Sequence, residues 1–121
     1  MTDSSKLIQS WIEFQRTQNP NLEWSNDDFI DLANEDPEVA WACILGVIET
    51  EPTEEILTNL AEGPMEDLLA EHGPKFIDRI EDTSKDNIVF ARLIKHVWVE
   101  GISTQIQNKI RTIQSKYGNH I

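Results

Sequence analysis

The sequence has 121 residues, of which 39% are hydrophobic and 26% are charged, so it can form one domain with a core. Its formal net charge of −12 argues against nucleic acid or an anionic membrane surface as a partner. The single cysteine excludes an internal disulfide, and no segment approaches the ~20 apolar residues of a membrane span. We therefore expect a single domain over residues 1–121, located in the cytoplasm.

Apolar residues recur at helical spacing through the first half of the chain and predict three helices. The proline in Asn19–Asn21 is expected to end the first helix, and Ser25 to cap the second. Asp36–Pro37 marks the start of the third, because proline suits the first helical position. The run Val39–Ile48 is apolar on every side, which is typical of a central helix. Gly46 within it indicates a close helix crossing.

The second half shows further helix start and stop signals. Thr53 is expected to cap a helix, and Gly63–Pro64 and Gly73–Pro74 are each expected to end one helix and begin another. Ser84 is expected to cap a longer helix whose apolar side includes Trp98. The last helix has a single narrow apolar stripe, formed by Ile102, Ile106, Ile110, Ile113 and Tyr117.

These signals predict an all-α fold, because no segment shows the alternation of a strand. We expect seven or eight short to medium helices, packed as stacked helical hairpins around the central apolar helix. Trp11, Trp41 and Trp98 are predicted to lie in the core, and Ile44 to be nearly inaccessible with Trp41. Trp24 either packs against the following helix as a hydrophobic staple or is an exposed aromatic anchor.

The charge is distributed unevenly along the chain. Residues 17–74 contain 15 acidic residues and no Lys or Arg, whereas residues 75–121 contain eight Lys and Arg against five acidic residues. A stretch without counter-charges raises self-repulsion within a domain. This pattern predicts a basic partner that neutralises the acidic surface.

The segment Ala61–Leu69, with the letters AEGPMEDLL, resembles a family of small bacterial proteins of unknown function that carry a Gly-Pro-Leu-Glu-Asp-Leu-Leu turn. Met65 stands where that family usually has leucine. The similarity extends over about the middle half of the chain, through Asp36–Glu38, Ala40–Trp41, His72–Gly73, Phe76–Glu81 and Val97–Trp98. The resemblance implies a compact helical bacterial domain and brings no activity or catalytic residues with it.

The sequence contains no recognisable catalytic or metal-binding pattern. His72, His96 and His120 are isolated from one another, and Cys43 lies in the apolar helix, where a buried and inert thiol is expected. Three carboxylates within one helical turn could attract a cation weakly, although acidic residues favour a first turn in any case. They belong to Asp27, Asp28 and Asp31. We expect no cofactor and no enzymatic activity.

The leading hypothesis is a small acidic binding protein that neutralises a basic, toxin-like protein by occlusion, as an immunity protein blocks a bacterial toxin, possibly a nuclease. The expected contact residues are Trp24 and eight acidic residues: Asp27, Asp28, Asp31, Glu51, Glu54, Glu55, Glu66 and Asp67. The protein is expected to be a monomer or a weak homodimer. Two alternatives stay open: an enzyme of unknown class, and a regulatory or scaffold module that oligomerises through the C-terminal isoleucine stripe.

Overall fold

The computed structural model of the chain describes residues 4–118, and all of the regular secondary structure in that range is helical. The prediction of an all-α fold is confirmed for this range; His120 lies outside it. The α-helices are α1 (Ser4–Thr17), α2 (Glu23–Glu35), α3 (Pro37–Thr50), α4 (Glu54–Leu60), α5 (Glu66–Asp86), α6 (Ile88–Lys95) and α7 (Thr104–Tyr117). A short 3-10 helix, η1 (Pro20–Leu22), precedes α2, and a π-helical turn, η2 (Ala61–Met65), joins α4 to α5.

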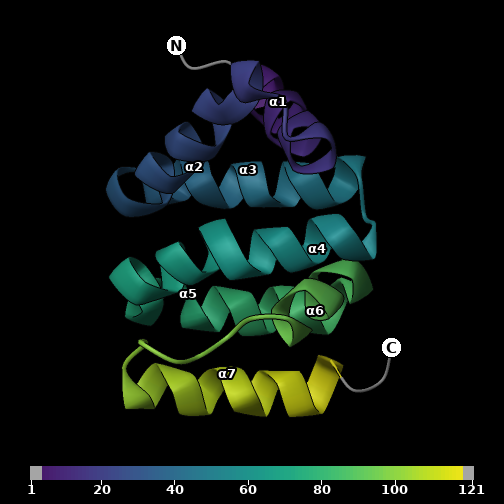
Figure 1. Cartoon of the computed structure of the whole chain (residues 1–121). Coiled ribbons are helices and arrows are strands. Elements are labelled where there is room, and N and C mark those ends of the chain that lie inside the picture. Colours follow the sequence, from purple (N-terminus) through teal and green to yellow (C-terminus); the bar gives the residue numbers. More distant parts are fainter. Residues whose placement is uncertain (1–3, 119–121) are drawn as a thin grey trace.

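The helices are stacked in layers along the molecule, as Figure 1 shows. Helices α1 and α2 cross at one end, α3 lies beneath them, and α7 forms the opposite end. Helix α3 contacts α1 and α2 as well as α4, α5 and α6, so it is central as predicted. Within residues 4–118, no helix is both long enough and apolar enough to cross a membrane.

The predicted break at Gly63–Pro64 is wrong, whereas the break predicted at Gly73–Pro74 is present as a kink between two helices. Helix α4, the π-helical turn and the first part of α5 continue into one another, so residues 4–118 contain six runs of helical residues rather than seven or eight, and the kink divides one of these runs. A π-helical turn changes the hydrogen-bonding pattern, which accommodates Pro64 without ending the helix. Helix α5 consists of two helices that meet at a kink, where His72 has non-helical torsion angles (φ −134°, ψ 21°) directly before Gly73–Pro74. Figure 1 shows the chain turning at this kink, so that the second half of α5 lies beneath α4 and the first half of α5.

Two predicted helix caps are also wrong, because the helices begin or end elsewhere. Asn19 caps the 3-10 helix that continues into α2, and Ser25 lies inside α2, where its hydroxyl donates to the Leu22 carbonyl at 2.6 Å. Ser84 is buried within α5, and Asn87 caps α6 instead. The predicted cap at Thr53 is confirmed, since its hydroxyl accepts a hydrogen bond from the amide of Ile56.

The core surrounds the aromatic residues of α1 and α3. Trp11 is 1% exposed, and the Trp41 ring, at 8% exposure, lies 5.6 Å from the Phe76 ring and 5.4 Å from the Phe90 ring. These predictions are confirmed. The prediction for Trp98 is wrong: its side chain is 61% exposed, because α6 ends at Lys95 and Trp98 lies in the loop that follows.

Two glycines lie at close approaches between helices. A Cβ at Gly46 would come 2.5 Å from the Ile8 side chain, as expected for the predicted close crossing of α3 with α1. A Cβ at Gly73 would come 3.2 Å from Ile106 on α7. Helix α7 thus packs its stripe against its own chain, and Ile106, Ile110 and Ile113 are at most 3% exposed. The stripe is not available as an oligomerisation surface, which removes the basis of that alternative.

Candidate functional site

The acidic stretch has counter-charges in space that it lacks in sequence. Arg79 donates to both carboxylate oxygens of Glu38, at 2.8 and 3.1 Å, and this pairing lowers the pKa of Glu38. Arg92 and His96 both bond to the Glu54 carboxylate, and these hydrogen bonds lower its pKa as well. The basic partners come from the C-terminal half, where the sequence has its positive charge. The self-repulsion inferred from the sequence is therefore relieved in part within the fold.

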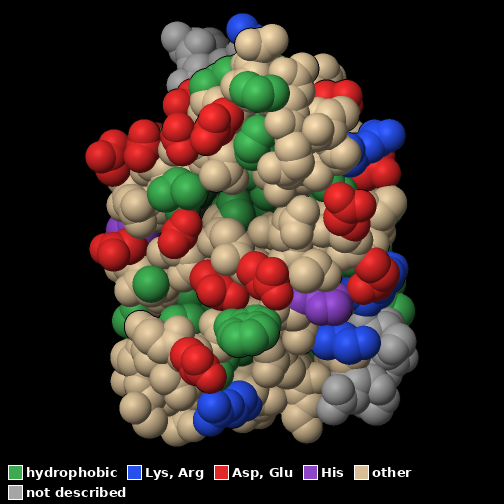
Figure 2. All heavy atoms as spheres, in the orientation of Figure 1, with side chains coloured by type: hydrophobic (Ala, Val, Ile, Leu, Met, Phe, Trp, Pro, Cys, Tyr) green, Lys and Arg blue, Asp and Glu red, His purple; other side chains and the backbone are tan. Residues whose placement is uncertain are grey.

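A different group of acidic residues surrounds an open groove of about 570 Å³ beside α1 and α2. Leu7 and Leu32 contribute its apolar surface. Its polar rim consists of Lys6, Trp24 and four carboxylates, those of Asp28, Asp31, Glu35 and Asp36. We call this site the α2 groove. Figure 2 shows acidic side chains gathered over this end of the molecule, where Figure 1 shows α2.

Helical spacing explains why these side chains share one surface. Trp24, Asp28, Asp31 and Glu35 are separated by four, three and four residues, so they lie along one face of α2. Asp27 belongs to the neighbouring face; it is exposed but does not line the α2 groove. The sequence pattern could have identified Glu35 by this spacing. Lys6 and Asp36 belong to the groove only through the tertiary arrangement.

Trp24 is a partly exposed aromatic residue in the α2 groove. It is the second residue of α2 rather than the residue before a cap, so the predicted staple does not form. Its ring is accessible, with 36% of the residue exposed. The ammonium of Lys6 lies 5.7 Å from the ring centroid, which is a cation–π distance. The groove thus already contains one cation, on an aromatic face bordered by carboxylates.

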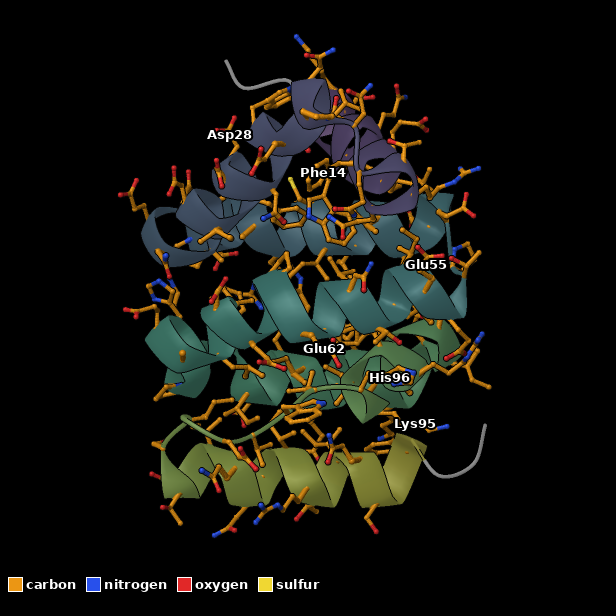
Figure 3. The ribbon with its side chains drawn as sticks, in the orientation of Figure 1. Phe14, Asp28, Glu55, Glu62, Lys95 and His96 are labelled. Atoms are coloured by element: carbon orange, nitrogen blue, oxygen red, sulfur yellow. The ribbon has the colours of Figure 1, made fainter. Side chains whose placement is uncertain are left out.

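The remaining predicted contact residues are dispersed over other layers. Glu51 is half-buried and lies 3.8 Å from Arg16, and Glu54 is paired as described above. Figure 3 shows Asp28 on α2 and Glu55 on α4 at different levels of the stack. The predicted set is therefore not one surface. Only Trp24, Asp28 and Asp31 of that set line the α2 groove.

Glu66 and Asp67 are half-buried at the start of α5. Burial raises the pKa of Glu66, and the neighbouring carboxylates add to this, although its hydrogen bond from the Trp98 amide acts in the opposite direction. Burial also raises the pKa of Asp67, with a contribution from Glu71. The Glu66 carboxylate accepts a hydrogen bond from the Trp98 backbone amide at 3.0 Å, so Glu66 holds the loop after α6 in place. Its observed role is structural.

Among the side chains that could perform chemistry, the expected burial of Cys43 is confirmed. Cys43 is fully buried, and burial raises the pKa of its thiol, which favours the unreactive protonated form. The His72 ring lies 2.9 Å from the Asn34 carbonyl. Among residues 4–118, no group of three or more His, Cys, Asp or Glu side chains could hold a metal ion.

Residues 4–118 thus form an acidic, all-helical fold with a carboxylate-lined groove beside α1 and α2. The chain belongs to the family of unknown function DUF6869, whose model matches residues 13–118. No curated protein and no solved structure matches the chain significantly. The matched range includes all of α2 and most of the α2 groove, but not Lys6 and Leu7 of α1.

Proposed function

We propose that the protein binds a basic protein partner through the α2 groove. The observation that supports this is the combination of the accessible Trp24 ring with four carboxylates along one groove. An arginine or lysine of the partner would take the place of the Lys6 ammonium on the Trp24 ring. Asp28 and Asp31 would then neutralise the incoming cation. An aromatic anchor with a rim of charges is a common arrangement of an interaction hot spot.

The proposed mechanism is occlusion. A basic cleft that holds nucleic acid presents cations spaced for phosphates, and a row of carboxylates can occupy the same positions. We propose on this basis that the partner is a bacterial toxin, possibly a nuclease, and that the protein is its immunity protein. The cytoplasm is the proposed site of action, because a single buried cysteine suits a reducing compartment.

The test uses the complete protein as bait in a lysate of its source cell, followed by identification of the retained protein. Two double variants accompany the wild type. Asp28→Lys with Asp31→Lys reverses two charges inside the α2 groove. Asp78→Lys with Asp82→Lys makes the same change in net charge at exposed positions of α5 outside it. Far-UV circular dichroism establishes that both variants keep the wild-type helicity.

The proposal expects a basic protein that the wild type and the α5 variant retain and that the groove variant loses. In low salt, the groove variant should associate with this basic protein at least about tenfold more slowly than the wild type, because the charges of the α2 groove attract the partner during the encounter. Co-expression with the wild type should also suppress the partner's toxicity. Equal slowing by both variants would show a bulk charge effect, and a wild-type rate for the groove variant would contradict the proposal outright.

A further inference from the structure

A second surface, far from the α2 groove in the fold, exposes the two most accessible large hydrophobic side chains of the described residues. Trp98 is 61% exposed and Ile88 is 63% exposed. Trp98 borders a hollow of about 360 Å³, and Ile88 borders a neighbouring one of about 440 Å³. Lys95 and His96 line both hollows, so the surface is continuous. We call it the Trp98 surface.

The loop that presents Trp98 is fixed by side chains from two other helices. The Glu66 carboxylate on α5 accepts a hydrogen bond from the Trp98 backbone amide at 3.0 Å. The side-chain amide of Gln114 donates to the carbonyl oxygens of Ile94 and Val97, each at 3.0 Å. An exposed indole on a fixed backbone loses little conformational entropy on binding, which favours it as an anchor. The Trp98 ring is thus exposed on a loop whose backbone is held by hydrogen bonds.

The charges of the Trp98 surface cancel. Its two hollows are lined by three carboxylates (Glu54, Glu62, Glu100) and three cations (Arg92, Lys95, Arg111), so three negative and three positive charges sum to zero. The whole chain has a net charge of −12. Figure 2 shows an exposed hydrophobic patch in this region between acidic side chains on one side and histidine and basic side chains on the other.

This balance identifies the kind of partner that fits. Two copies of a chain with charge −12 repel each other at most orientations. They can approach through a surface that is neutral and has both signs, because twofold symmetry makes each contact reciprocal, so an acidic residue of each copy can face a basic residue of the other. Figure 3 shows Glu62 and Lys95 on either side of His96 on one face. A strongly basic or strongly acidic partner would find no excess of opposite charge here.

We propose that the Trp98 surface is a twofold interface with a second copy of this chain. Trp98 and Ile88 supply its exposed apolar side chains, and Lys95 of each copy faces Glu62 of the other. The dimer leaves the α2 groove open in both copies, since the groove is built from α1 and α2. Dimerisation is independent of the proposed function, and either one can fail without the other.

Sedimentation velocity over a concentration series tests the proposal on the complete chain. The wild type should dimerise with a dissociation constant in the range of about 1 to about 100 µM, as expected for a small interface. Trp98→Ala should weaken the dimer at least about 30-fold, the usual effect of removing a hot-spot aromatic. Trp24→Ala, the matched control in the α2 groove, should dimerise like the wild type.

A charge exchange tests the pairing itself. Glu62→Lys and Lys95→Glu should each prevent dimerisation, because each places like charges in both facing pairs. An equimolar mixture of the two variants should form a heterodimer, since both of its pairs then have opposite signs. A wild type that stays monomeric throughout the series would overturn the proposal. A dimer that Trp98→Ala leaves intact, or a mixture that does not associate, would overturn it as well.

Discussion

Replacing Trp41 by alanine tests the packing around the central helix. The Trp41 ring lies between the Phe76 and Phe90 rings, and the Arg79 guanidinium carbon is 5.6 Å from its centroid. A tryptophan side chain buries about 150–250 Å², which corresponds to about 4–6 kcal/mol at about 25 cal/mol per Å². The methyl group that alanine retains and the partial burial in the unfolded chain reduce this, so we expect a loss of about 3–5 kcal/mol.

Urea unfolding followed by far-UV circular dichroism measures this loss. Trp98→Ala is the matched control, because it removes the same side chain at a position that is 61% exposed. At a low protein concentration, where the chain is monomeric, the control should lose less than about 1 kcal/mol. A loss below about 1 kcal/mol for Trp41→Ala, with an unchanged dependence on urea, would refute the central position of this residue.

Three further predictions concern single positions. Asn87→Ala should lower the free energy of unfolding by about 1 kcal/mol, because the Asn87 side chain caps α6. Ser84→Ala should leave stability unchanged or raise it, because the buried Ser84 hydroxyl has no hydrogen-bond partner. Urea titrations measure both effects. Gly63→Ala should raise the free energy of unfolding by about 0.5–1 kcal/mol, seen as a higher melting temperature, because a Cβ at this position would meet nothing within 4 Å and φ is not positive there. A destabilising effect would show instead that Gly63 has the left-handed conformation common at helix ends. Burial raises the pKa of Asp67, so its carboxyl group binds a proton more tightly in the native state than in the unfolded chain, and stability falls as the pH rises and the group ionises. Asp67→Asn should therefore increase stability at pH 7. Thermal melts should show that this increase disappears towards a pH of about 3, where the carboxyl group is protonated in both states.

The fold class and the central helix could be predicted because helical spacing and apolar content are properties of neighbouring residues. The run from Val39 to Ile48 identified α3, and Thr53 identified the start of α4. The Gly63–Pro64 pair was misread because its usual role at helix ends is only a local tendency, whereas a kink does precede Gly73–Pro74. Gly73 also lies where α7 approaches α5 through Ile106, a contact between residues that are far apart in sequence.

The candidate site was predicted only in part. The sequence analysis selected Trp24, Asp28 and Asp31, but it also selected Glu54, whose charge Arg92 balances from 38 positions further along the chain. It assigned Trp98 to the core, because the apolar pattern of α6 continues beyond the residue at which the helix ends. Neither the pairing of a charge nor the end of a short helix is a local property.

The amino-acid sequence by itself determined that this chain is helical, has a central apolar helix, and is strongly acidic, because these features depend on composition and on spacing within one element. Only the tertiary structure decided which carboxylates are neutralised and which line the α2 groove. It also decided that the isoleucine stripe of α7 is covered and that Trp98 is exposed. These outcomes depend on which helices pack together, and packing brings together residues whose separation in sequence says nothing about their distance in space.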